Sequence, residues 1–92
     1  MKPERQIRRP LLAAGVRYRW DELRQQHQVL FPEGLLVLNE SGAAIIRLCD
    51  GRSTDDLVSA LQKQIADGDP SGDVHEFLRR LASKGILRDG DI

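Results

Sequence analysis

Residue types that could carry catalysis or hold a metal ion are scarce in this chain of 92 residues. The histidines are His27 and His75, and the single cysteine is Cys49. His75 and Glu76 match the start of the zinc-protease motif His-Glu-x-x-His, but Arg79 stands where the second histidine is needed. Cys49 shares the apolar stripe of a predicted helix, which favours a buried, unreactive thiol over a nucleophile. These residues therefore predict neither a metal site nor a catalytic centre.

The paired carboxylates and the glycines have local explanations as well. Asp55-Asp56 and Asp67-Asp69 lie at predicted helix caps and turns, where carboxylates accept backbone hydrogen bonds. The eight glycines do not form a phosphate-binding pattern. We therefore expect a binding module without a cofactor or a metal ion, and not an enzyme. A small enzyme that uses Cys49 as its nucleophile is kept as a third, weaker hypothesis.

The charge is balanced overall but not along the chain. Fourteen Lys and Arg cancel fourteen Asp and Glu, unlike the basic excess of most nucleic-acid-binding domains. Residues 1–19 hold six basic side chains and one acidic one, and the rest hold 8 basic and 13 acidic. We therefore predict a flexible basic arm over 1–14, a globular domain over 15–88 and a tail over 89–92. The arm either docks on its own acidic body or contacts an acidic partner.

The chain shows no signal for export or for membrane insertion. One cysteine cannot form an internal disulfide, and the opening MKPERQIRRP lacks the apolar core of a signal peptide. A run of about 18 apolar residues, as a membrane-spanning helix requires, is missing. We expect a soluble, cytoplasmic protein that does not contact membranes.

The first half of the chain predicts three antiparallel strands. In 15–21 the sequence is GVRYRWD, and apolar or aromatic residues alternate with arginines, as in a half-buried strand. Two shorter segments follow, QVLFP at 28–32 and GLLVLN at 34–39. Pro32 suits the end of a strand because it cannot donate a ladder hydrogen bond. The three segments predict a β-meander.

The second half changes to helical spacing. A helix over 40–49 is capped by Asn39 and followed by Gly51, and a second helix is capped by Ser53. The third helix, over about 72–84, takes Ser71 or Asp69 as its cap and ends at Gly85. The whole is an α+β fold, winged-helix-like, with a three-stranded antiparallel N-terminal sheet followed by three α-helices.

Two binding modes fit such a module. A winged-helix domain could place its third helix, with Arg79, Arg80 and Lys84, in a DNA major groove, although the acidic body opposes phosphate contacts. Alternatively, an extended peptide could add to the edge of the apolar strand 34–38 as a further strand. If the protein's own helices and arm cover both faces of that strand, no such binding site is left.

Three stretches of this sequence resemble one family. They are GVRYRWDELRQQHQVLFPEG, LLVLNESGAAIIRLCDGRST and DVHEFLRRLASKGIL, and together they cover about residues 10–88. They resemble PqqD, the peptide chaperones of pyrroloquinoline quinone (PQQ) biosynthesis. The resemblance implies a recognition element for a ribosomally made precursor peptide (RiPP). Such a module binds the peptide PqqA as an added strand and presents it to the radical-SAM enzyme PqqE, without a catalytic residue or cofactor of its own.

The resemblance also implies where the peptide binds. The predicted binding edge is Gly34, Leu35, Leu36, Val37 and Leu38, and the predicted opposing wall is Val74, Phe77, Leu78 and Leu81, with Arg80 and Lys84 placed to meet acidic residues of the peptide. Leu78 and Leu81 have an alternative place in the core, and the basic arm has PqqE as an alternative partner. A monomer and a weak homodimer are both compatible with the sequence.

Overall fold

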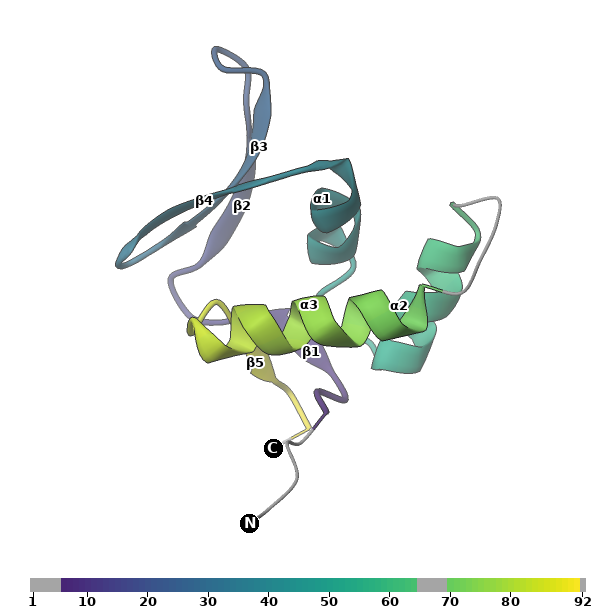
Figure 1. Ribbon diagram of the computed structural model, residues 1–92. Coiled ribbons are helices and arrows are strands. Elements are labelled where there is room, and N and C mark those ends of the chain that lie inside the picture. The colour runs from purple at the N-terminus through teal and green to yellow at the C-terminus, as the bar shows by residue number, and fades with distance from the viewer. Residues whose placement is uncertain (1–5, 65–69, 92) are drawn as a thin grey trace.

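A three-stranded antiparallel sheet and three helices form the body of the molecule (Figure 1). The computed structural model describes residues 6–64 and 70–91. The strands β2 (Arg17–Asp21), β3 (Gln26–Phe31) and β4 (Gly34–Leu38) pair in the order β2-β3-β4. The predicted meander is therefore confirmed, with β3 starting two residues earlier than expected.

The turn between β2 and β3 is organised by the carboxylate of Asp21. It accepts the backbone N–H groups of Leu23 at 3.0 Å and Arg24 at 3.2 Å. The N–H of Arg24 is the main reason why the pKa of Asp21 lies below its ordinary value. Gln25 then takes a left-handed φ of 55°, and β3 begins at the next residue. This hairpin extends beyond the helices in Figure 1, and Leu23 near its tip is 88% exposed.

The helices are α1 (Glu40–Arg47), α2 (Thr54–Gln62) and α3 (Ser71–Ser83). Two of the predicted caps are confirmed: Asn39 Oδ1 accepts the N–H of Gly42 at 2.8 Å, and Ser53 Oγ accepts that of Asp56 at 3.0 Å. The cap predicted for α3 is wrong for Ser71, which is the first residue of the helix, and Asp69 lies outside the described residues. Pro70 holds the N-cap position and makes no side-chain cap. A proline suits a helix start because its fixed φ and missing N–H cost nothing there.

The hydrophobic core lies where the inner face of the sheet meets the helices. Its most buried members include Val29 of β3, Leu57 of α2, Val74 and Leu78 of α3, and Ile86 just after α3. Gly85 takes a left-handed φ of 78°, which turns the chain back so that the Ile86 N–H reaches the Leu81 carbonyl at 3.0 Å. The end of the third helix at Gly85, predicted from the sequence, is confirmed to within two residues.

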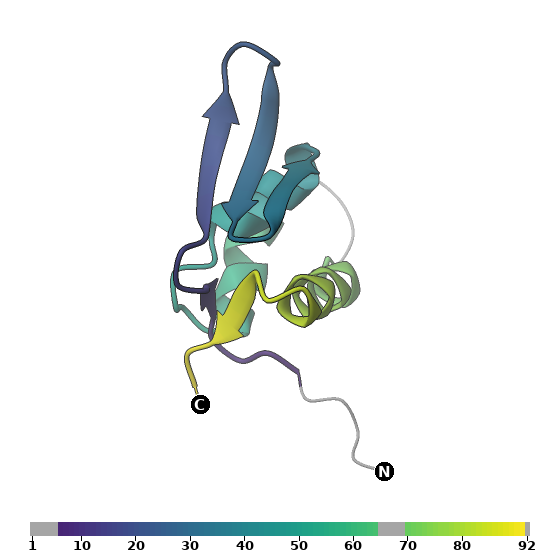
Figure 2. The same cartoon turned by 90° about the vertical axis from the view of Figure 1, so that its left-hand side faces the viewer.

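A second, two-stranded sheet was not expected. The strand β1 (Pro10–Leu12) pairs antiparallel with β5 (Leu87–Asp89) below the larger sheet (Figure 2). Residues 10–12 were predicted to be part of an irregular arm, and that prediction is wrong. Three-residue strands are too short to show a period of two, and each forms only because its distant partner is present.

The segment before β1 docks on the body of the protein itself. Thr54 donates its hydroxyl hydrogen to the Ile7 carbonyl at 2.6 Å, and its N–H donates to the Arg8 carbonyl at 2.8 Å. The N–H groups of Arg8 and Arg9 each donate to the Asp89 carboxylate at 3.1 Å. Of the two alternatives left open for the arm, docking on its own body therefore holds for residues 6–12.

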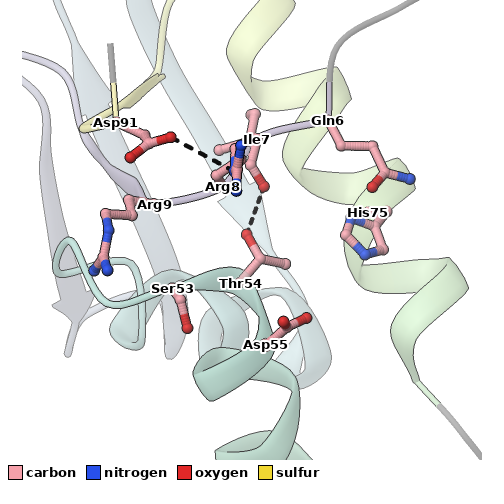
Figure 3. A pocket seen from close by; sticks show the side chains of 9 residues that line it. All are labelled: Gln6, Ile7, Arg8, Arg9, Ser53, Thr54, Asp55, His75 and Asp91. Atoms are coloured by element: carbon pink, nitrogen blue, oxygen red, sulfur yellow. Dashed lines mark hydrogen bonds and ion pairs between the residues drawn. The ribbon is translucent and has the colours of Figure 1, made fainter.

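A polar hollow of about 280 Å³ opens beside this docked segment (Figure 3). Its walls come from the docked segment, the start of α2, α3 and the chain end, and they contain Gln6, Ile7, Arg8, Arg9, Ser53, Thr54, Asp55, His75 and Asp91. Charges of both signs meet here, and Arg8 pairs with Asp91 at 3.5 Å. The hollow thus lies at the interface between the N-terminal segment and the body of the protein.

Replacing Thr54 by valine is expected to lower the free energy of unfolding by about 1 kcal/mol, because the part-buried hydrogen bond from its hydroxyl to the Ile7 carbonyl is lost. Thr54 is only 4% exposed, so water does not replace the hydroxyl. Urea unfolding measures the loss, and Thr54→Ser, which keeps the hydroxyl, is the matched control. Equal stability of Thr54→Val and the wild type would show that this contact does not secure the segment.

Candidate functional site

A groove of about 400 Å³ separates the end of β4 and the start of α1 from one face of α3. Its lining is Leu36, Val37, Leu38, Asn39, Ser41, Gly42 and Ile45 on one side, and Asp73, Glu76, Phe77, Arg80, Leu81 and Lys84 on the other. The floor is apolar and the rim is polar or charged. The groove adjoins the outer edge of β4.

Gly42 sets the width of the groove. A Cβ atom at this position would lie 3.4 Å from Phe77 Cε1, 3.4 Å from Leu38 Cδ2 and 3.3 Å from Asn39 Oδ1. The missing side chain therefore lets α1 and β4 approach α3 closely. Gly42 is thus a position of close packing, and a larger residue there would push these elements apart.

The outer edge of β4 is unpaired within the described part of the chain. In the strand order β2-β3-β4, only one side of β4 is occupied, by β3. Alternate residues of such an edge strand direct their N–H and C=O groups away from the sheet. Leu35 is 46% exposed and Val37 is 51% exposed, which is high for apolar residues of a strand. The edge therefore combines free backbone groups with exposed apolar side chains.

The structure brings seven of the eleven predicted site residues to the groove. They are Leu36, Val37, Leu38, Phe77, Arg80, Leu81 and Lys84. Gly34 and Leu35 are exposed on β4 but do not line the groove. Val74 and Leu78 do not line it either, because they are 0% and 1% exposed and belong to the core. For these two residues the predicted place in the groove wall is corrected.

Sequence reasoning missed six lining residues. Asn39, Ser41, Gly42 and Ile45 enter the groove only because α1 crosses α3, which is a tertiary contact without a sequence signal. Asp73 and Glu76 had a readable signal. They precede Arg80 by seven and four residues, a spacing that places side chains on one helix face.

A polar network holds β3 against the start of α1 behind the groove. The His27 side chain is buried in β3, and its ring contacts the Tyr18 hydroxyl at 2.7 Å and Glu40 Oε1 at 3.0 Å. Arg47 donates to the Tyr18 oxygen at 2.8 Å, so the hydroxyl hydrogen is free to donate to His27 Nδ1. The two ring nitrogens therefore have partners on both sides, Tyr18 at Nδ1 and Glu40 at Nε2. These bonds position the neighbouring strand β4, where Leu38 pairs with His27.

Cys49 is a buried residue of the core. It is 6% exposed, and its Sγ donates to the Ile45 carbonyl at 3.3 Å. Burial raises the pKa of the thiol to about 12, with a further rise from the neighbouring carboxylate of Asp50. Within residues 6–64 and 70–91, no group of three His, Cys, Asp or Glu residues is placed to hold a metal ion. No helix in the same ranges has the length and apolar character to cross a membrane.

We expect Ellman's reagent to modify Cys49 in the native protein at pH 8 at least about a hundredfold more slowly than in the urea-unfolded chain. The thiolate is the reactive form, and a pKa of about 12 leaves very little of it at this pH. The absorbance of the released thionitrobenzoate gives both rates. Similar rates in the two states would show that Cys49 is accessible in the native protein, as the hypothesis of a Cys49 nucleophile requires.

Comparison with known sequences identifies relatives along most of the chain. The family described as Coenzyme PQQ synthesis protein D (PqqD) matches residues 26–87. A protein of Methylococcus capsulatus named PqqA binding protein is 39% identical over 81 residues, covering 85% of each chain. A protein of Methylorubrum extorquens named bifunctional coenzyme PQQ synthesis protein C/D is 37% identical over 81 residues, which is 85% of this chain but 22% of that protein.

A solved structure agrees with the fold as well. It is the solution NMR structure of the PqqD truncation of Methylobacterium extorquens PqqCD, described as a functional and stand-alone RiPP recognition element. The two structures superpose with a TM-score of 0.72 at 32% identity, over 86% of this chain and 87% of the other. With a family match over about two thirds of its length and relatives above 30% identity, the chain belongs to the PqqD family.

Proposed function

We propose that this protein binds the precursor peptide PqqA as an additional strand along β4 and presents it to the radical-SAM enzyme PqqE. The observation that carries the proposal is the open edge of β4, which continues directly into an apolar groove facing α3. Relatives named PqqA binding protein support the identity of the peptide. A peptide lying there would pair its backbone with β4 and turn alternate side chains toward α3.

The energetics require both the edge and the groove. About five backbone hydrogen bonds at a net value near 1 kcal/mol each contribute about 5 kcal/mol. Micromolar binding corresponds to about 8 kcal/mol. The remaining 3 kcal/mol match the burial of about 120 Å² of apolar surface. Leu36 and Phe77 line the groove and are only partly buried, so they offer such surface.

The protein's own contribution is to bind and orient the peptide. The chemistry of the pathway then belongs to the enzyme that receives the complex, and this chain needs no catalytic residue.

Isothermal titration of the protein with synthetic PqqA peptide tests the proposal. We expect saturable binding in the micromolar range or tighter, and none to a scrambled peptide of the same composition. A DNA duplex at low salt is titrated in parallel, since a winged-helix regulator would bind it in a salt-dependent way. Absence of PqqA binding together with binding of DNA would overturn the proposal in favour of that alternative.

A further inference from the structure

The charged residues of the groove are sorted by sign along α3. Four ionisable residues line the groove, and all belong to this helix: Asp73, Glu76, Arg80 and Lys84. Their spacing of three or four residues places them in one stripe on the groove side of the helix. The stripe is acidic at the N-terminal end of α3 and basic at its C-terminal end.

The two ends of the stripe act independently in water. Asp73 and Lys84 are eleven residues apart, which is about 16 Å along a helix. This distance is about twice the Debye length of about 8 Å at physiological ionic strength, so neither end neutralises the other. A bound peptide therefore meets a negative electrostatic field at one end of the groove and a positive one at the other.

Three of the four side chains have no ion-pair partner among the residues that the structure describes. Glu76 is engaged by Arg79, whose Nη2 lies 3.2 Å from its Oε2. For Asp73, Arg80 and Lys84, the described ranges contain no such pair. The helix dipole accounts for acidic residues at the start and basic residues at the end of α3. It does not require them to lie on the groove face, where a ligand would meet them.

We propose that this stripe fixes the direction in which the peptide lies in the groove. An acidic side chain of the peptide contacts Arg80 and Lys84, and a basic side chain contacts Asp73. A strand rises about 3.3 Å per residue, so 16 Å corresponds to about five residues. Because alternate side chains share a face, the two charges of the peptide stand four or six residues apart. If the peptide lay in the reversed direction, its charges would face like charges of α3 at both ends of the stripe.

The strand β4 and the helix α3 run in opposite directions on the two sides of the groove. Each charged end of α3 therefore corresponds to one end of β4. In Figure 1, β4 runs toward α1 while α3 runs in the opposite direction, and Figure 2 shows α3 below β4. The close approach of Gly42 to Phe77 places the start of α1 and the end of β4 beside the middle of α3. The acidic end therefore lies toward α1, past the C-terminal end of β4, and the basic end lies toward the start of β4.

Charge reversal on both partners tests this inference, which rests on the proposed function. Titration calorimetry compares the wild type with Lys84→Glu, Arg80→Glu and Asp73→Lys against the PqqA peptide and single charge reversals of that peptide. We expect each basic-end variant to bind the PqqA peptide about tenfold more weakly, and an acid-to-lysine peptide to restore its affinity. A peptide in which one basic residue is replaced by glutamate should restore the affinity of Asp73→Lys only. The acidic and the basic peptide positions whose reversal restores affinity should lie four or six residues apart.

The controls separate local contacts from net charge and from folding. Arg88→Glu reverses an exposed charge on β5 that does not line the groove, and it should change affinity less than twofold. The neutral variant Lys84→Gln should lose about threefold, and circular dichroism verifies the fold of each variant. Equal effects of Arg88→Glu and Lys84→Glu, or rescue by any peptide charge change, would overturn the directional role while leaving peptide binding in place. A wild type that does not bind PqqA at all would overturn both.

Discussion

Replacing Val37 by aspartate is expected to lower the affinity for the PqqA peptide by at least about thirtyfold while the domain stays folded. Val37 is 51% exposed on the β4 edge and lines the groove, so a bound strand would cover its remaining surface. The variant loses that apolar contact and places a carboxylate under the peptide. Together these effects cost about 2 kcal/mol or more, which is about thirtyfold in the dissociation constant.

The matched control is Leu23→Asp at the tip of the β2–β3 hairpin. Leu23 is also an exposed apolar residue, at 88%, but it does not line the groove. Calorimetric titration of both variants compares their affinities, and urea unfolding compares their stabilities. Wild-type affinity in Val37→Asp, or an equal loss in Leu23→Asp, would contradict the placement of the peptide along β4.

Leu78→Ala is expected to lower the free energy of unfolding by about 2–5 kcal/mol, because Leu78 is 1% exposed and its removal leaves a cavity. Small domains are stable by only about 5–15 kcal/mol, so this is a large share of the total. The urea midpoint measures the change. Leu23→Ala is the matched leucine control, and its exposed position should keep the change within about 0.5 kcal/mol.

The Leu78→Ala variant also distinguishes a role of Leu78 in the core from a role in the groove wall. Leu78 lies on α3 beside Phe77 and Leu81, which line the groove, but its own side chain points into the core. A folded Leu78→Ala variant should therefore keep its affinity for the peptide within about twofold. An unchanged urea midpoint combined with weaker peptide binding would instead return Leu78 to the groove wall.

The elements with strong local signals were predictable from the sequence. The alternation of Tyr18 and Trp20 with arginines indicates β2, and Pro32 marks the end of β3. Asn39 and Ser53 cap α1 and α2 as expected because their side chains bond within three residues. Such signals depend on neighbours in the chain, so a single sequence contains them.

The parts that depend on distant contacts were not predictable in this way. Pro10–Leu12 becomes a strand only by pairing with Leu87–Asp89 at the other end of the chain. On α3 the apolar stripe through Val74 and Leu78 was assigned to the groove, but the hydrophobic core is larger and takes this stripe first. The groove receives the adjacent stripe of Phe77 with the charged residues, and Leu81 lies between the two, buried in the core but touching the groove. Only packing against α1 and β4 decides between two neighbouring faces of one helix.

The most direct test of the central claim is a backbone-amide NMR titration of the protein with PqqA peptide. We expect shifts concentrated at residues 34–45 and 73–84, which form the β4 edge and the groove beside it. Shifts concentrated instead at residues 6–12 and 53–55, or at the hairpin tip around Leu23, with the groove unchanged, would contradict it.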